Sequence, residues 1–260
     1  MNDNMKLKMM ELRETMKAYS DEAWEEPSDQ SQGIPQPPLE KASYGTKLIP
    51  LTKVYDQVLQ NNDFLNLLNN RTSKRKYTEQ PITMDELSFL LWATQGVKQV
   101  IGKKNQATLR NVPSAGARHP FETYLLVHRV EGLEPGLYHY LALEHKLEYI
   151  REIENLSDRI TEATCGQPFL GNAAVDFVWS VIPYRCEWRY TLDAHKYILL
   201  DAGHVCQNLY LACEAIGCGT CAIGAYDQAL IDTLLGFDSK PSYEDNNEFV
   251  IYLAPVGKVE

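Results

Sequence analysis

The sequence lacks two features that define large classes of protein: a long apolar run and an excess of positive charge. No stretch approaches the roughly 18 apolar residues of a membrane-spanning helix, and the N-terminal segment MNDNMKLKMMELRETMK has no apolar stretch of a signal peptide. The formal net charge of −10 disfavours nucleic acid and anionic membrane surfaces as partners, because both are negatively charged. We therefore expect a cytoplasmic protein that binds neither.

The sequence also lacks the short signatures of several enzyme classes. It contains no GxSxG of serine hydrolases, no Walker loop and no GxGxxG. The glycines of Gly217-Cys-Gly219-Thr-Cys-Ala-Ile-Gly224 have the wrong spacing for a dinucleotide loop and follow a predicted helix. The six histidines show no HxxxH spacing, and one CxxC cannot supply the four ligands of a zinc site. These absences argue against a Rossmann-bound nicotinamide cofactor and against a metal centre.

Six cysteines could form three disulfides, but the chain is long and shows no export signal, so we expect reduced, buried thiols. The one CxxC, Cys218-Gly-Thr-Cys221, follows a predicted helix. A redox-active pair starts a helix instead, where the helix dipole lowers the thiol pKa. We interpret this pair as part of the core.

Composition divides the chain near residue 50. Residues 1–50 are rich in proline, acidic and small polar residues, which predicts an extended arm. Within it, Ile34, Pro35, Pro37 and Pro38 suit a polyproline conformation along a surface groove. Residues 51–260 carry the periodic apolar patterns of helices and strands, and they are numerous enough to bury a substantial core. We expect one compact domain there.

Residues 51–260 mix helices and strands without regular βαβ alternation. Residues 54–70 predict a helix, and Thr83-Met-Asp-Glu86 is a capping box that opens a second helix ending at Gly96. The segments 123–130, 136–140 and 146–150 predict an antiparallel meander, and the apolar run 173–183 predicts a central strand. A long helix over about 186–216, a strand at 220–224, a helix capped by Asp227 and a last strand at 249–257 follow. This order predicts an α+β fold, a mostly antiparallel sheet sandwiched by helices.

In the segment Arg71-Thr-Ser73-Lys-Arg75, an arginine, a serine and a second arginine stand at alternate positions. In an extended segment, residues two apart point the same way, so Arg71, Ser73 and Arg75 share one face. Such a face suits a phosphate dianion or a ribityl chain. A solvated basic turn is the alternative.

A second unusual segment, Pro113-Ser-Ala-Gly-Ala-Arg118, precedes the strand at 123. Its small side chains allow backbone amides to approach a flat ring at van der Waals distance. Pro113 and Pro120 hold the shape of the loop. The alternative is a tight turn before a strand.

Six segments occur in an order that resembles the nitroreductase superfamily of FMN proteins, and within it the SagB-type branch of thiazole/oxazole-forming dehydrogenases. They are R-x-S-x-R at 71–75, LSFLLWATQG, NVPSAGARHPFETYLLV, GLYHY, DAGHVCQNLYLACEAIGCGTCAIGAY and YLAPVGK. The resemblance covers about residues 60–258. It implies a nitroreductase-like, entwined homodimer with two FMN molecules at the interface, each contacted by both subunits.

The resemblance also implies roles for individual positions. Arg71, Ser73, Arg75 and Lys258 would hold the FMN phosphate and ribityl hydroxyls. Gln167 would hydrogen-bond the pyrimidine edge of the isoalloxazine, and backbone near its reactive side would come from Ile223, Gly224 and Ala225. A set from the partner chain would lie against the ring: Pro113, Ser114, Ala115, Gly116 and Arg118.

The pair Lys196-Tyr197 precedes Asp201-Ala-Gly-His204 in the predicted long helix. In the azoline oxidases of the SagB-type branch, such a pair is thought to assist proton removal from the heterocycle. A lysine desolvated near an apolar ring has a lowered pKa and can act as a base. The alternative is an interfacial pair in which the lysine reaches towards solvent.

The resemblance implies an FMN-dependent oxidoreductase that transfers hydride through flavin N5. Two substrate classes fit: acceptors of an NAD(P)H-dependent nitro or quinone reductase, and a peptide azoline for a SagB-type dehydrogenase that uses oxygen. A flavin-destroying benzimidazole synthase is a further alternative. The contrasting hypothesis is a flavin-binding partner protein that catalyses no reaction.

Overall fold

The centre of the molecule is a seven-stranded sheet in which neighbouring strands pair antiparallel. The computed structural model describes residues 2–17, 27–43, 47–53, 55–237 and 247–260. The strand order is β1-β6-β5-β4-β7-β9-β8. The bounds are β1 (Leu48–Pro50), β4 (Phe121–Val127), β5 (Gly136–Leu141), β6 (Lys146–Arg151), β7 (Val175–Val181), β8 (Cys218–Thr220) and β9 (Phe249–Lys258). The predicted α+β class and antiparallel sheet are confirmed.

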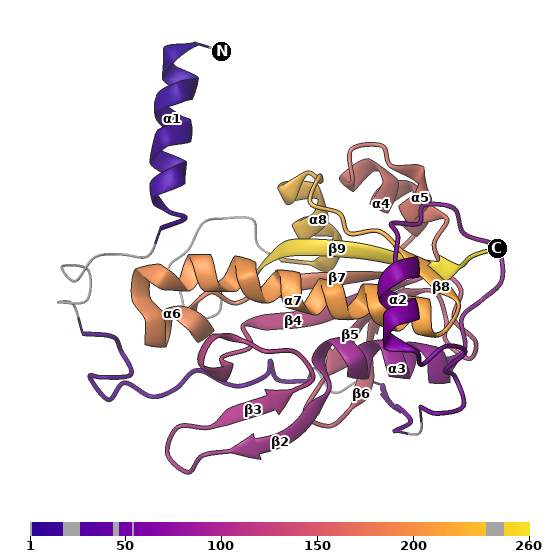
Figure 1. The fold of residues 1–260 in the computed structure, drawn as a ribbon, viewed down its shortest axis with the longest axis horizontal. Helices are drawn as coiled ribbons and strands as arrows, with labels where there is room; N and C mark the ends of the chain where they lie inside the picture. The colour runs from indigo at the N-terminus through magenta and orange to yellow at the C-terminus, as the bar shows by residue number, and fades with distance from the viewer. Residues whose placement is uncertain (1, 18–26, 44–46, 54, 238–246) are drawn as a thin grey trace.

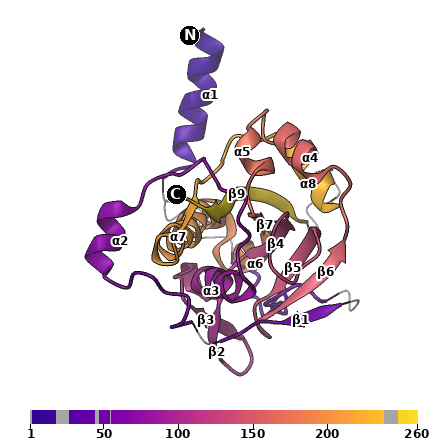
Figure 2. The ribbon, with the colours of Figure 1, turned by 90° about the vertical axis from the view of Figure 1, so that its right-hand side faces the viewer.

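Both faces of the sheet are buried, because helices cover each of them (Figures 1 and 2). Every residue of β4 and β7 is buried, which explains their nearly continuous apolar sequences. Alternate residues point to opposite faces, so Phe177 belongs to one core and its neighbour Val178 to the other.

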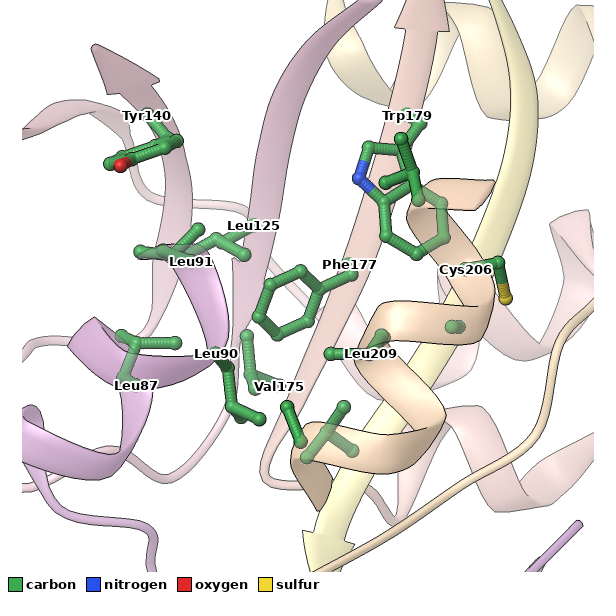
Figure 3. Packing of buried hydrophobic residues seen from close by; sticks show 14 of the residues in the cluster. Leu87, Leu90, Leu91, Leu125, Tyr140, Val175, Phe177, Trp179, Cys206 and Leu209 are labelled. Carbon is green, nitrogen blue, oxygen red and sulfur yellow. The ribbon is translucent and has the colours of Figure 1, made fainter. Parts of the chain in front are cut away.

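One face is covered by α3 (Met84–Gln95) and α7 (Ala194–Ala215). Figure 3 shows Phe177 of β7 between the leucines of α3 and Leu209 of α7. The other face is covered by α4 (Leu156–Ala163), α5 (Pro168–Gly171) and α8 (Gln228–Leu235). The predicted caps are confirmed: Thr83 and Glu86 form a capping box, and Asp227 caps α8.

Two predicted helices differ from the observed ones. The helix predicted over 54–70 is formed only as α2 (Phe64–Asn70), capped by Asp63; residue 54 lies outside the described residues. The helix predicted over about 186–216 is divided into α6 (Tyr184–Tyr190) and α7 by a turn at Thr191–Asp193. Thr191 has φ 46°, a left-handed conformation that interrupts a helix.

The arm predicted as extended contains a helix, α1 (Asp3–Glu14), none of whose residues is buried. At its other end, the last three residues of the predicted arm form β1, which pairs with β6 in the main sheet. Residues 34–38 form no regular element. They lie beside a hairpin of β2 (Val97–Ile101) and β3 (Ala107–Arg110), where Gln36 exchanges two hydrogen bonds with the backbone of Gln106 (2.7 and 2.8 Å).

All six cysteines are unpaired, and five of them are buried, as expected. Burial raises the pKa of the Cys218 thiol to about 12. None of the helices in the described part of the chain combines the length and apolar character that crossing a bilayer requires.

Candidate functional site

The segment that follows α2 is held to helix α7 by Tyr210. The guanidinium of Arg71 lies 5.3 Å from the centre of the Tyr210 ring, and Ser73 Oγ is 2.9 Å from Tyr210 Oη. The same Oη accepts a hydrogen bond from the backbone N–H of Ala222 (2.8 Å). Arg71 and Ser73 therefore contact one side chain, as residues two apart on a common face can.

The other cations of this segment differ in their surroundings. Lys74 Nζ forms an ion pair with Glu214 of α7 (3.0 Å), and the Lys74 backbone N–H donates to the carbonyl of Thr220 (2.9 Å). Arg75 is exposed and lines a surface hollow of about 590 Å³ together with Lys76 and the C-terminal Glu260. The structure thus leaves Arg75 accessible beside Arg71 and Ser73 in the chain.

Gln167 and the segment 223–225 meet at the same end of the molecule. Gln167 Nε2 donates to the carbonyls of Thr164 (2.8 Å) and Ala225 (3.1 Å). Gly224 and Ala225 are exposed, and a Cβ added to Gly224 would meet nothing within 4 Å. Ile223 is fixed by backbone hydrogen bonds with Leu253 (2.8 and 3.2 Å). The exposed backbone of Gly224 and Ala225 therefore follows a residue that is fixed to strand β9.

The predicted loop 113–118 lies at the other end of α7, near α6. Its Ala115 backbone N–H donates to the Asp201 carboxylate, 3.2 Å from each oxygen, and the His119 N–H donates to Ser114 Oγ (2.9 Å). Gly116 has φ 53°, and a Cβ there would lie 2.5 Å from Tyr190 Oη. The small residue is thus required by contact with α6.

Lys196 and Tyr197 start α7 beside this loop. The Tyr197 ring packs edge-on against Tyr190 at 4.9 Å between centroids, and Tyr190 in turn contacts Gly116. Burial, with the negative charge of Asp193, raises the pKa of Tyr197. Tyr197 is therefore a protonated hydroxyl at neutral pH, which can donate a hydrogen bond or a proton.

Two predicted cofactor-binding residues are occupied within the protein. Arg118 is only 4% exposed, and its guanidinium lies 5.1 Å from the centre of the Trp188 ring. Burial, followed by the charge of Arg189, lowers its pKa. Lys258 forms an ion pair with Glu86 at the start of α3. Burial alone would lower the pKa of Lys258, but the Glu86 carboxylate raises it. The structure does not bring either charge to the exposed residues described above.

The remaining predicted residues fall into two regions, which we name the phosphate-end region and the loop-end region. The phosphate-end region comprises Arg71, Ser73, Arg75, Gln167 and residues 223–225. The loop-end region comprises residues 113–116 with Lys196 and Tyr197. The first region contacts α7 through Tyr210 and the second through Asp201, and in Figure 1 α2 and β8 lie near one end of α7 and α6 near the other. The nine residues from Asp201 to Tyr210 correspond to a rise of about 14 Å at 1.5 Å per residue.

Sequence reasoning missed Tyr210 and Asp201, the two α7 side chains that hold these regions. Asp201 gave a signal, since a carboxylate within an apolar helix needs hydrogen-bond donors. Tyr210 gave none, because a tyrosine among leucines and alanines suits a core equally well.

Comparison with known proteins places this geometry in a family. The profile of the nitroreductase family matches residues 68–258. A protein of Methanocaldococcus jannaschii named as a nitroreductase is 32% identical over 192 residues, which cover 74% of this chain and 89% of that protein. The trifolitoxin-processing protein TfxB of Rhizobium leguminosarum bv. trifolii is 25% identical over 134 residues, covering 49% of this chain but only 35% of that protein.

Solved structures share the fold. A protein of Anabaena variabilis described as a nitroreductase superposes with a TM-score of 0.72 at 24% identity, covering 95% of this chain and 45% of that one. The NADPH:FMN oxidoreductase of Vibrio harveyi, complexed with NAD⁺, superposes with a TM-score of 0.51 at 17% identity, covering 76% and 70%. Because the family profile spans most of the chain and a relative above 30% identity covers three quarters of it, this protein belongs to the nitroreductase family of oxidoreductases.

Proposed function

We propose that the protein is an FMN-dependent oxidoreductase that acts as a homodimer. Each FMN lies between the phosphate-end region of one protomer and the loop-end region of its partner. The observation that supports this proposal is that the phosphate-end region contacts Tyr210 of α7, whereas the loop-end region contacts Asp201, nine residues earlier in the same helix. A two-fold axis that brings one end of each α7 to the other end of its partner completes two sites at once.

The residues of the phosphate-end region fit the polar part of FMN. Arg71 and Arg75 offer positive charge and several N–H donors to a phosphate that carries nearly two negative charges. Ser73 adds a hydroxyl between them in sequence. These groups create a local cationic site on a chain whose net charge is −10. Lys258 is left out of this set, because its charge is paired with Glu86.

The same region fits the edge of the isoalloxazine ring. Both amide hydrogens of Gln167 are bound to carbonyls, so its Oε1 is left to accept a hydrogen bond. The pyrimidine edge of a flavin offers such a donor at N3–H. The open backbone at Gly224 and Ala225 leaves room for a flat ring, and backbone N–H groups fixed near N1 and O2 favour the reduced flavin.

When bound, FMN supplies hydride transfer at N5 of its ring. The chain's own residues position the ring, keep one face open and supply protons. We assign proton transfer to Lys196 and Tyr197, which lie beside the loop 113–116 that would face the partner's flavin. We assign hydrogen-bond donation to the Tyr197 hydroxyl, whose pKa is raised by burial, and proton acceptance to Lys196.

Two substrate classes follow from this arrangement. One is a nitro compound or quinone reduced at the expense of NAD(P)H. The other is a peptide azoline, whose oxidation requires removal of a proton as well as a hydride. The pair Lys196-Tyr197 and the similarity to a trifolitoxin-processing protein favour the second class.

Mixed dimers test the shared site directly. Arg71→Ala with Arg75→Ala damages the phosphate-end region, and Pro113→Glu places a charge in the loop-end region at an exposed position. Each variant alone should bind little FMN. After the two variants are unfolded and refolded together, about a quarter of all sites should be intact and bind FMN, since half of the dimers are mixed and each has one undamaged site.

The outcome is read from flavin absorbance and from mass by light scattering. Recovery of no FMN in a mixture that forms dimers would place the site within one protomer and contradict the proposal. A wild-type protein that takes up no FMN would contradict it more broadly. With the wild type loaded, NAD(P)H consumption with a quinone and conversion of an azoline peptide distinguish the two substrate classes.

A further inference from the structure

Tyr210 contacts both the segment 71–73 and the backbone of Ala222, yet the proposed function gives it no role. It projects from α7, is half-buried, and lies under the Arg71 guanidinium. Its hydroxyl bonds Ser73 Oγ on one side and the Ala222 N–H on the other, at 2.9 and 2.8 Å. The hydroxyl therefore links the phosphate-binding segment to the backbone that leads into Ile223 and Gly224.

Chemistry fixes the direction of one of these two hydrogen bonds. A backbone N–H can only donate, so Tyr210 Oη accepts from Ala222. Between Tyr210 Oη and Ser73 Oγ either hydroxyl can donate, and Tyr210 still has one proton to give. Donation from Tyr210 leaves the proton of Ser73, an exposed residue, available to a ligand.

We propose that Tyr210 is a positioning residue that fixes Ser73 as a hydrogen-bond donor to the ligand phosphate; this inference rests on the proposed FMN site. A free serine hydroxyl rotates and can present either its proton or its lone pairs to a ligand. The relay from Ala222 through Tyr210 to Ser73 removes that choice. The site is then preorganised for an oxygen acceptor such as a phosphate oxygen.

Arg71 strengthens this arrangement. Its guanidinium lies over the Tyr210 ring, where the negative face of the aromatic system attracts the cation. The ring thus holds a cation and orients a hydroxyl on the same short segment. A phosphate that contacts Arg71 would meet a Ser73 proton and no opposing lone pair.

The test is a double-mutant cycle on FMN affinity, with apoprotein prepared by removing the flavin. Tyr210→Phe deletes only the hydroxyl, and it should weaken FMN binding about tenfold, since a charge-assisted hydrogen bond loses its orientation. Ser73→Ala should weaken binding at least as much. The double variant should bind no more weakly than Ser73→Ala, because Tyr210 acts through Ser73. Additive losses would overturn the relay.

Binding of riboflavin, which lacks the phosphate, tests whether the lost affinity belongs to the phosphate. Tyr210→Phe and Ser73→Ala should leave the affinity for riboflavin nearly unchanged. An equal loss for FMN and riboflavin would overturn the assignment of the Ser73 proton to the phosphate. If Tyr210→Phe does not fold, the affinities of Ser73→Ala for FMN and riboflavin still test whether Ser73 binds the phosphate.

Tyr138→Phe is the matched control, because it deletes a tyrosine hydroxyl that is hydrogen-bonded elsewhere, to the carbonyl of Glu134 (2.8 Å). It should bind FMN as the wild type does. Unchanged FMN affinity in Tyr210→Phe would overturn the inference while leaving the flavin site intact. Failure of the wild-type protein to bind FMN would refute the proposed function itself, so the two failures are distinct.

Discussion

The two ends of α7 hold their neighbouring segments by different chemistry. At the end nearer α6, the Asp201 carboxylate accepts hydrogen bonds from the backbone of the loop 113–116. At the other end, the Tyr210 hydroxyl joins Ser73 and Ala222. The Asp201 carboxylate changes its charge in acid, whereas the contacts named at the other end join two hydroxyls and a backbone N–H. The loop end should therefore respond to pH, and the phosphate end should not.

The residues at the two ends of α7 also suit different functions. The phosphate end carries exposed cations and open backbone, which suit binding. The loop end carries Lys196 and Tyr197 beside small residues, which suit proton transfer against a ring. Substitutions at one end should thus change cofactor affinity, and substitutions at the other should change turnover.

The largest expected effect is on affinity at the phosphate end. Arg71→Ala together with Arg75→Ala should weaken FMN binding by about 3–6 kcal/mol, since each charge-assisted hydrogen bond contributes about 1.5–3 kcal/mol. Fluorescence titration of the apoprotein measures this. Lys103→Ala, which removes an exposed cation from the hairpin β2–β3, is the control. Unchanged FMN content in the double variant would show that the phosphate is bound elsewhere.

The next effect is on turnover at the loop end. Lys196→Ala should retain FMN and lose azoline oxidation by about 10² or more, the usual contribution of a general base. Steady-state rates and flavin content, measured on the same preparation, separate the two quantities. Full turnover in this variant would show that Lys196 is not a base. Loss of flavin would show that the loop end also contributes to cofactor affinity.

A smaller effect is expected on stability at the loop end. Gly116→Ala should lower the free energy of unfolding by about 1–3 kcal/mol, because φ is positive and the new Cβ meets Tyr190 Oη. Gly166→Ala is a matched control: its φ is +78°, but a Cβ there would meet nothing within 4 Å. The difference between the two melting temperatures measures the Tyr190 contact. Equal melting temperatures would show that the Tyr190 side chain moves away from the new Cβ without a loss of stability.

The smallest effect is a dependence of stability on pH through Asp201. Burial raises the pKa of this carboxyl, although Ser114 and the Ala115 N–H act in the opposite direction. Between the unfolded pKa and the higher folded pKa, the native state binds more protons, so this group's contribution to stability falls as pH rises through that range. It is constant above the folded pKa.

Urea unfolding from pH 4 to pH 7 tests this point. The difference in unfolding free energy between wild type and Asp201→Asn should change with pH in favour of the wild type at the acidic end, by less than about 1.4 kcal/mol per pH unit. The same measurement on Asp158→Asn, an exposed position on α4, is the control for loss of a surface carboxylate. A constant difference for Asp201→Asn would remove the pH contrast between the two ends.

Sequence reasoning succeeded where the determining contacts are local. The capping box of Thr83 and Glu86, and the cap at Asp227, depend on residues three apart, so the pattern itself specifies them. The nearly continuous apolar run over residues 173–183 likewise indicated a central strand, observed as β7. The motif order was enough to indicate the family, which the comparisons confirm.

Sequence reasoning is weaker where a distant partner decides. The ion pair of Lys258 with Glu86, 172 residues away, is not indicated by any local pattern, and the role of Lys258 at the phosphate stays a prediction. The interruption of the predicted long helix at Thr191 requires a positive φ in a β-branched residue, which local propensity disfavours and tertiary packing enforces. The helix α1 arose in a segment whose composition predicted extended chain.

The amino-acid order by itself therefore determined the elements, the antiparallel sheet and the family, because periodicity and capping act over a few residues. The tertiary structure alone decided which predicted residues lie together. It set the phosphate-end region against Tyr210 and the loop-end region against Asp201 of the same helix, since hydrogen bonds between segments 86 or more residues apart depend on the packed fold.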